Sequence, residues 1–430
     1  MSYGPQGNQY GAPPPQQGWG GAQPPPQQWG PPAQQWGPPA QQWGPPAHQS
    51  GPPAQQWGAP VHQSGPPAQQ WGGAPAHQSG PPAQQWGGAP TQQSGPPAQQ
   101  WGAPQVHPAP PSPGYDPNVI AQGDASRDAK ALRAAMKGFG TDERALITIL
   151  AKPDPLQMAL LRNTYNSIHR RDLLSDVESE TSGYFRDGLM SLVRGPLAQD
   201  TYNINKAIKG LGTKESLLND VLIGRTNADM RAIKQAYSST YHRTMESDIR
   251  GDLSMKTEKL FDLILAATRA EETTPIIPQE IERHVGDLYA ATIGRSQGAD
   301  QITVCGILTS GSNGQIRAIA QQFEARYHTS LIKALERRFD GHMEDALVLL
   351  IKRACDPAMT DAEQLESAMS GIGTEDFLLV QRVVRIHWNR QHLDQVKRAY
   401  QHRYKKDLVG RVKGEISNKY YEALMVACLS

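Results

Sequence analysis

The chain has 430 residues, with 42 Lys and Arg against 41 Asp and Glu, so its formal net charge is only +1. A chain this close to neutral has no overall basic field, which argues against a nucleic-acid partner and against membrane binding by bulk electrostatics. It also has no run of 18 apolar residues and no basic start followed by an apolar segment, so we expect neither a membrane span nor a secretory signal.

Residues 1–115 differ in composition from the rest of the chain. They contain no Asp, Glu, Lys, Arg, Leu, Ile or Phe, and they hold all but one of the 9 tryptophans. The phrase WGPPAQQ recurs around Trp29, Trp36 and Trp43, and longer units follow. A segment rich in Pro, Gln and Gly cannot bury enough apolar surface to offset its ordering entropy, so we predict a disordered tail with local polyproline II conformation. The tryptophans are either adhesive points for a partner or parts of a passive spacer.

The remainder of the chain aligns with itself in four repeats. An aromatic residue heads each pattern, and apolar residues follow eight and twelve positions later: Tyr165, Leu173 and Val177; Tyr237, Met245 and Ile249; Phe323, Leu331 and Leu335; Tyr400, Leu408 and Val412. These offsets fit one face of a helix, or of two helices in sequence. We therefore predict an all-α array, with repeats at 124–195, 196–271, 278–354 and 358–430, in which short helices bury their apolar stripes against neighbours.

A glycine pair interrupts three of the four repeats. MKGFGTDE begins at Met136, IKGLGTKE at Ile208 and MSGIGTED at Met369. Fifteen positions after the aromatic residue, the same three repeats carry an acid: Glu180, Asp252 and Glu415. In this register the third repeat has Ser296 in place of the first glycine and Arg338 in place of the acid. Because glycines and acid are kept or lost together, we infer that they serve one site.

The chemistry of these groups favours a calcium site. Glycine adopts backbone angles that other residues avoid, so a GxG segment can turn successive carbonyl groups the same way. Calcium takes about six to eight oxygen ligands, whereas magnesium demands a tight octahedron and keeps its waters. One carboxylate is few, so we expect weak binding to calcium alone and tighter binding when a lipid phosphate completes the shell. Two alternatives are a simple helix C-cap and turn, and a phosphate-binding nest helped by Lys137 and Lys209, which leaves the distant acids unexplained.

At these residues the chain resembles an annexin. The resemblance covers about residues 124–430 and rests on the [LMI]-K-G-x-G-T loop followed at fixed distance by its acid, with a shifted spacing in the fourth repeat. GRTNADMRAIKQAY in the second repeat and ESETSGYF in the first are also similar to the family. The resemblance implies four repeats of about five helices in a slightly curved disc, with calcium loops on its convex face. It also implies calcium-dependent binding to acidic phospholipids such as phosphatidylserine.

Carried over by position, the resemblance implies three calcium sites. Their residues are Met136, Gly138, Gly140 and Glu180; Ile208, Gly210, Gly212 and Asp252; and Met369, Gly371, Gly373 and Glu415. The apolar tips Phe139, Leu211 and Ile372 would project beside each ion and contact the membrane. The third repeat is expected not to bind calcium, although its Arg338 could touch a lipid phosphate directly.

The leading hypothesis is a cytoplasmic protein that becomes peripheral on membranes when calcium rises and acts as a scaffold or as a trafficking or repair factor. The tail is similar to those of long-tailed annexins, which implies a protein partner, and the family resemblance makes self-association on membranes plausible. Two alternatives are a soluble assembly protein that acts mainly through the tail and a phosphate-handling enzyme. The sequence has neither GxxxxGK[ST] nor HExxH, so we predict that it is not an enzyme.

Overall fold

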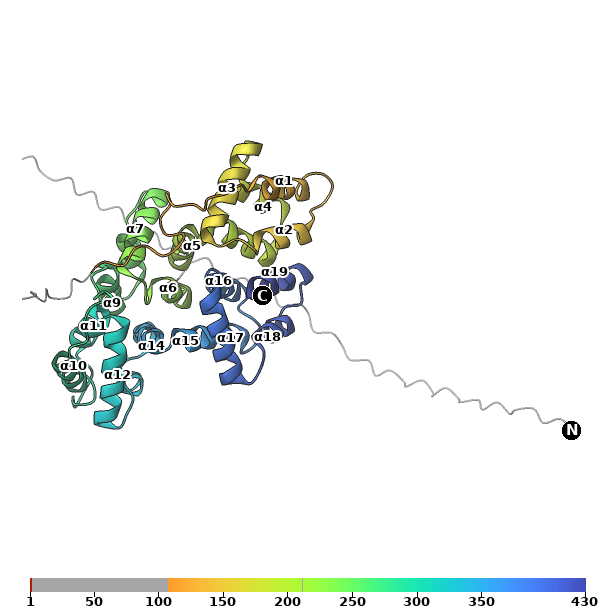
Figure 1. Cartoon of the computed structure of the whole chain (residues 1–430). Helices are drawn as coiled ribbons and strands as arrows, with labels where there is room; N and C mark the ends of the chain where they lie inside the picture. The colour runs from red at the N-terminus through yellow and green to blue at the C-terminus, as the bar shows by residue number, and fades with distance from the viewer. Residues whose placement is uncertain (2–106, 211) are drawn as a thin grey trace, which may run out of the picture. The chain divides into compact units, whose positions relative to one another are not determined.

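A computed structural model of the protein describes Met1, residues 107–210 and residues 212–430. Within these residues it contains nineteen helices and no strand (Figure 1). None of these helices combines the length and the apolar character needed to cross a bilayer. Residues 2–106 of the predicted tail lie outside the described residues, and so does Leu211.

Each repeat comprises five helices. The first contains α1 (Ser126–Ala135), α2 (Glu143–Leu150), α3 (Pro155–His169), α4 (Leu173–Glu180) and the first part of α5 (Gly183–Ile208). The second contains the rest of α5 and then α6 (Glu215–Leu222), α7 (Asn227–Tyr241), α8 (Met245–Asp252) and α9 (Met255–Leu265). The third contains α10 (Pro278–Ala291), α11 (Gln301–Ser310), α12 (Asn313–Tyr327), α13 (Leu331–Glu336) and α14 (Gly341–Cys355). The fourth contains α15 (Pro357–Met369), α16 (Asp376–His387), α17 (Arg390–Tyr404), α18 (Leu408–Glu415) and α19 (Lys419–Leu429).

The long helix α5 is broken where the first repeat meets the second. Gly195 has φ 74° and ψ 173°, which is not helical, and Pro196 follows it. A proline has no backbone N–H to donate and suits the first turn of a new helix, so the chain changes direction here without leaving helical conformation for long.

The predicted apolar register is confirmed, and it belongs to two helices in sequence. All twelve of its residues are buried: Tyr165, Leu173, Val177, Tyr237, Met245, Ile249, Phe323, Leu331, Leu335, Tyr400, Leu408 and Val412. The aromatic residue lies in the third helix of each repeat, which ends at a residue in the left-handed conformation: Arg170, His242, His328 or Lys405. Two positions later a side chain caps the fourth helix, and the capping residues are Asp172, Thr244, Ser330 and Asp407.

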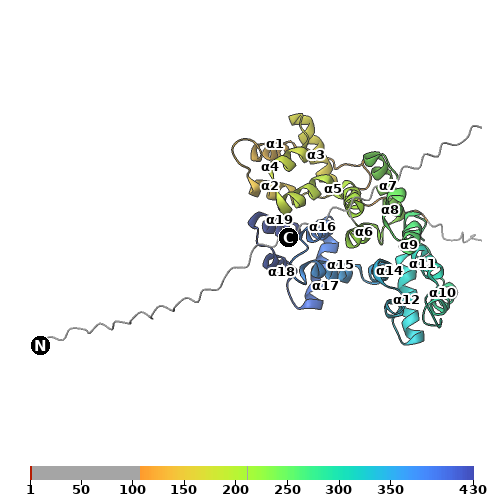
Figure 2. The same cartoon turned by 180° about the vertical axis from the view of Figure 1, so that it is seen from behind.

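The repeats share two hydrophobic cores in a pairing that chain order does not suggest. One core joins residues 129–193 of the first repeat to residues 362–429 of the fourth. The other joins the second repeat to the third, and Leu378 also belongs to it. In both views α19 accordingly lies beside α2 of the first repeat, which is far away in the sequence (Figures 1 and 2).

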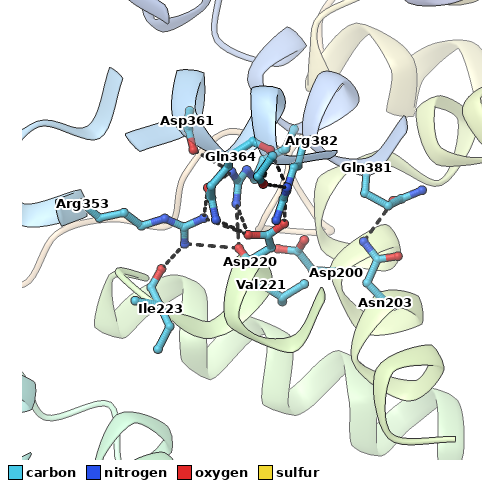
Figure 3. Close-up of polar contacts among 12 residues, drawn as sticks. Asp200, Asn203, Asp220, Val221, Ile223, Arg353, Asp361, Gln364, Gln381 and Arg382 are labelled. Carbon is cyan, nitrogen blue, oxygen red and sulfur yellow. Dashed lines mark hydrogen bonds and ion pairs between the residues drawn. The ribbon is translucent and has the colours of Figure 1, made fainter. Parts of the chain in front are cut away.

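A polar cluster lies where helices of the second, third and fourth repeats meet (Figure 3). Asp220 of α6 is its centre: the Arg382 Nε of α16 lies 2.7 Å from its Oδ2, and the Arg353 Nη2 of α14 lies 3.7 Å from its Oδ1. Arg385 of α16 reaches the same carboxylate at 3.9 Å and also pairs with Asp361 of α15 at 2.6 Å. Opposite charges thus compensate one another in an interior that would not tolerate them singly.

The segment 107–118, called the strap here, lies against the helices. Ser112 donates its backbone N–H and its hydroxyl to the two carboxylate oxygens of Asp229, each at 2.7 Å. Tyr115 is buried, and its hydroxyl donates to Asp200 at 2.5 Å and accepts from Arg225 at 2.5 Å. Burial raises the pKa of the Tyr115 phenol well above its ordinary value. The prediction that the tail is disordered as far as residue 115 is therefore corrected for residues 107–115. The buried Tyr115 ring and the hydrogen bonds to Asp229 and Asp200 offset the ordering entropy of this segment.

Candidate metal sites

The glycine pairs of three loops share one pattern of backbone angles. The first loop (136–142) joins α1 to α2, the second loop (208–214) joins α5 to α6, and the fourth loop (369–375) joins α15 to α16. Their first glycines have φ 120°, 123° and 113°, and their second glycines have φ 82°, 76° and 89°: Gly138, Gly210 and Gly371, then Gly140, Gly212 and Gly373. A Cβ at any of these six positions would meet nothing within 4 Å, so the backbone angles, and not a lack of space, require glycine.

The ends of each loop are closed in the same way. The N–H of Asp142 donates to the carbonyl of Ala135 at 2.9 Å, and the corresponding bonds in the second and fourth loops are 2.8 and 2.9 Å long. The first residue of the loop fastens it to a core: Met136 and Met369 are buried, and Ile208 packs against the core of the second and third repeats. The glycine turn is therefore held between two fixed ends.

A threonine joins each loop to its acid. The Thr141 hydroxyl donates to Glu180 Oε2 at 3.2 Å, Thr213 to Asp252 Oδ2 at 2.5 Å and Thr374 to Glu415 Oε2 at 3.0 Å. Glu180, Asp252 and Glu415 are the last residues of α4, α8 and α18, so the end of the fourth helix brings each carboxylate to its loop. The structure thus brings together the glycines and the acid of each predicted site.

The donor set suits a calcium ion. Each site offers main-chain carbonyls of a glycine turn and one carboxylate, and calcium accepts such oxygens in a flexible arrangement. Among the described residues, no group of three or more His, Cys, Asp and Glu side chains could hold a metal, so ligands here would come mainly from the main chain. Met136, Gly138, Gly140 and Glu180 would hold the ion in the first repeat, with water or an external oxygen completing its shell.

The third repeat is built differently. Its closing bond runs from the Asp300 N–H to the Ala291 carbonyl at 2.8 Å, so this third loop (292–300) is two residues longer than the others. Ala299 stands where the other loops have threonine, and Arg338 stands where they have the acid. Arg338 donates to the carbonyls of Arg295 at 2.8 Å and Ile293 at 3.5 Å. One nitrogen of its guanidinium is therefore bound to the loop, and the expectation that Arg338 touches a lipid phosphate stays a prediction.

The shifted spacing of the fourth repeat has a simple origin. Its loop has the same length as the first two, because the Glu375 N–H closes on the Ala368 carbonyl. The extra residues lie in the following helix, since α16 has 12 residues where α2 and α6 have 8. The fourth loop differs in another respect: Arg411 of α18 donates to Glu415 and to the Met369 carbonyl, the latter at 2.8 Å. Its guanidinium holds the pKa of the Glu415 carboxyl below the ordinary value.

The predicted membrane-contacting tips are exposed where the structure describes them. The relative exposure of Phe139 is 114% and that of Ile372 is 111%, the largest values among the exposed apolar residues after Met1. Leu211 lies outside the described residues. Two large apolar side chains held in full contact with water, each between the glycines of a loop, are unusual for a structural role.

The threonines and Arg411 are the site residues that sequence reasoning missed. The threonines carried a signal, because each follows the second glycine of its loop directly. Arg411 carried a weaker one: its position corresponds to Asp176 and Asp248 in the first two repeats, so the sign of the charge is reversed only in the fourth.

The comparisons with known proteins agree with this geometry. The sequence model of the annexin family matches residues 127–192, 199–264, 290–350 and 360–427. The chain is similar to annexin C1 of Cryptococcus neoformans var. grubii, with 40% identity over 74% of this chain and 68% of that protein. It is also similar to annexin A11 of Oryctolagus cuniculus, with 31% identity over 71% of this chain but only 60% of that protein's length.

Solved structures give the same result. Annexin III superposes with a TM-score of 0.67 and 26% identity, covering 74% of this chain and 98% of that one. A calcium-bound annexin (Sm)1 superposes with a TM-score of 0.63 and 25% identity, covering 73% of this chain and 93% of that one. The four repeats and the helical fold are thus similar to those of known annexins, and the chain belongs to the annexin family.

Proposed function

We propose that this annexin binds acidic phospholipid membranes in a calcium-dependent way, through its first, second and fourth loops. Annexins are known for this activity, and the fold and the family match support it. The observation that carries the proposal is the threefold recurrence of one arrangement, in which a positive-φ glycine pair is joined by a threonine to the carboxylate 39 or 41 residues further on.

Calcium would act as a bridge between protein and lipid. A loop with one carboxylate leaves part of the coordination shell to other oxygens, and a phospholipid phosphate supplies oxygens of the kind that calcium prefers. The net charge of +1 supplies no general attraction to an anionic surface, so binding depends on the ion. The exposed side chains of Phe139 and Ile372 would add burial of apolar surface in the headgroup region.

The proposal is tested by co-sedimentation with phosphatidylserine and phosphatidylcholine vesicles across a calcium titration. The variant Glu180→Gln with Asp252→Asn removes the carboxylates of the first two loops, and we expect it to need at least about tenfold more calcium for half-maximal pelleting. Glu178→Gln with Glu246→Gln is the matched control, because it removes acids from the same two helices away from the loops. Undiminished pelleting of the first variant would contradict the assignment of these sites.

We also propose that the tail recruits a protein partner and does not drive membrane binding, because every candidate ion ligand lies between residues 136 and 415. Deletion of residues 1–106, which leaves the strap intact, should therefore preserve calcium-dependent pelleting. If the truncated chain no longer pellets while the full chain does, the tail is the membrane-active part and the protein acts mainly through it.

A further inference from the structure

In two of the four loops an arginine side chain donates hydrogen bonds to the loop, and in the fourth loop it occupies candidate ion ligands. In the fourth loop, Arg411 donates one nitrogen to Glu415 Oε1 and another to the Met369 carbonyl at 2.8 Å. These acceptors are the first carbonyl and the carboxylate of the candidate calcium site. In the third loop, Arg338 donates to the carbonyls of Ile293 and Arg295.

The first and second loops contain no such group. Glu180 and Asp252 accept hydrogen bonds only from Thr141 and Thr213 among the described residues. The position of Arg411 is occupied there by Asp176 and Asp248, which instead accept hydrogen bonds from the buried tyrosine hydroxyls, at 2.6 Å from Tyr165 and 2.8 Å from Tyr237.

An ion pair between the first and fourth helices of a repeat has opposite signs in the first and fourth repeats. In the first repeat Arg133 of α1 faces Asp176 of α4 at 3.6 Å. In the fourth repeat the corresponding residues are Glu366 of α15 and Arg411 of α18, with 3.4 Å between the Arg411 Nε and the Glu366 Oε2. Because the arginine of this pair lies on α18 in the fourth repeat, its guanidinium group reaches the loop. The Arg411 side chain is only 17% exposed, so Glu366 on one side and Glu415 on the other hold it in place.

We infer that Arg411 is an internal competitor for calcium at the fourth loop, and that Arg338 replaces the ion permanently at the third. This inference rests on the proposed calcium sites. Calcium at the fourth loop must first displace the Arg411 guanidinium from Glu415 and from the Met369 carbonyl, which are two candidate ligands of the ion. Hydrogen bonds from a guanidinium to a carboxylate are stronger than those between neutral groups. At the third loop Arg338 stands in place of the acid itself, so the loop has no counterpart of Glu180. The chain therefore fills its first and second loops at low calcium and its fourth only at higher calcium.

The test isolates the fourth loop in the full-length protein. Calcium binding is measured by isothermal titration calorimetry, without lipid, in the Glu180→Gln, Asp252→Asn background, where the remaining binding belongs to the fourth loop. Adding Arg411→Gln should tighten this binding about tenfold or more. Lys413→Gln removes the same charge from an exposed position of the same helix, and we expect it to change the affinity less than about twofold.

Two further variants keep the test decisive. Arg411→Lys keeps the charge and its pairing with Glu366 but has a single ammonium in place of the planar fork, so it should give an intermediate affinity even if Arg411→Gln folds poorly. Arg338→Gln in the wild-type background should leave the number of bound ions unchanged, and an additional ion would overturn the assignment of the third loop.

The outcomes separate the two proposals. If the Glu180→Gln, Asp252→Asn background still binds calcium like the wild type, the site assignment itself is wrong. If that background has lost its tighter sites, but both Arg411 variants bind calcium as weakly as Lys413→Gln does, the sites stand and Arg411 is no competitor.

Discussion

A histidine in the core of the fourth repeat shows how a single residue makes the stability of this protein depend on pH. His387 ends α16, and its side chain is buried. Its Nδ1 donates to the carbonyl of Cys428 at 2.9 Å, so Nδ1 carries the proton, and Nε2 has no hydrogen-bond partner among the described residues. Burial lowers the pKa of the His387 imidazole to about 4.

The sign of the effect follows from this lowered pKa. An unfolded histidine has a pKa of about 6.5, so between about pH 6.5 and 4 the unfolded chain binds a proton that the folded chain does not. The contribution of His387 is fully present above this window and is lost as the pH falls through it, by about 2 kcal/mol between pH 7.5 and 5. His387→Asn keeps a donor for Cys428 but does not titrate. Urea unfolding at the two pH values should therefore show a smaller loss for this variant, with His402→Asn, at an exposed position of α17, as the control.

The loop threonines show how far a single residue can be understood from sequence. Each follows its glycine pair in the chain, which made the loop recognisable. The partner of the hydroxyl could not be read from this local pattern, because the carboxylate approaches only after α4, α8 or α18 has been placed in space. The role of Arg411 was still harder to predict from the sequence, because it depends on which side of α18 faces the loop.

The strap is the element whose structure was not predicted. Its sequence, HPAPPSPGYDPN, has no helical or strand pattern, and its proline-rich composition indicated disorder. The partners that order it are distant: Glu271 for the Ala109 N–H, Asp229 for Ser112, and Asp200 with Arg225 for Tyr115. Composition describes what a segment can bury by itself, but not which acceptors a neighbouring surface offers.

Removing the Tyr115 hydroxyl tests whether this contact stabilises the fold. Tyr115→Phe keeps the buried ring but takes a donor from Asp200, whose burial raises the pKa of its carboxyl. We expect a loss of about 1–3 kcal/mol in the free energy of unfolding, measured by urea denaturation. Tyr184→Phe, on a partly exposed ring of α5, should change stability much less. Equal stabilities of wild type and Tyr115→Phe would mean that the strap packs only through its ring.

At the scale of the whole molecule, the polar cluster around Asp220 connects three repeats. Arg353 and Arg382 come from the third and fourth repeats, and Asp220 from the second is a counter-charge common to them (Figure 3). Arg385 of the fourth repeat reaches the same carboxylate. Burial lowers the pKa of the Arg353 guanidinium to about 9, which still leaves it charged at neutral pH. Among the described residues, these three arginines form ion pairs with only two carboxylates, those of Asp220 and Asp361.

Loss of this counter-charge should therefore be costly. Asp220→Ala leaves the buried Arg382 without an ion-pair partner and weakens the compensation of Arg353 and Arg385, and we expect a loss of about 3–5 kcal/mol in the free energy of unfolding. Scanning calorimetry in calcium-free buffer would report the change as a fall in Tm. Asp394→Asn, at an exposed position of α17, is the control. A Tm within a degree of the wild type would show that water, and not Asp220, compensates these arginines.

The sequence by itself determined the all-helical class, the four repeats, the buried register and the pairing of glycines with an acid. The first three features follow from the local periodicity of apolar residues. The last follows from residues with a special backbone or charge, such as Gly138 and Glu180. Only the tertiary structure decided that the first repeat shares its core with the fourth and the second with the third. Four repeats with the same apolar stripe can pair in several ways, and long-range packing and charge compensation select among them. The same holds for Arg411, because only its position in space gives it the ligands of a calcium ion.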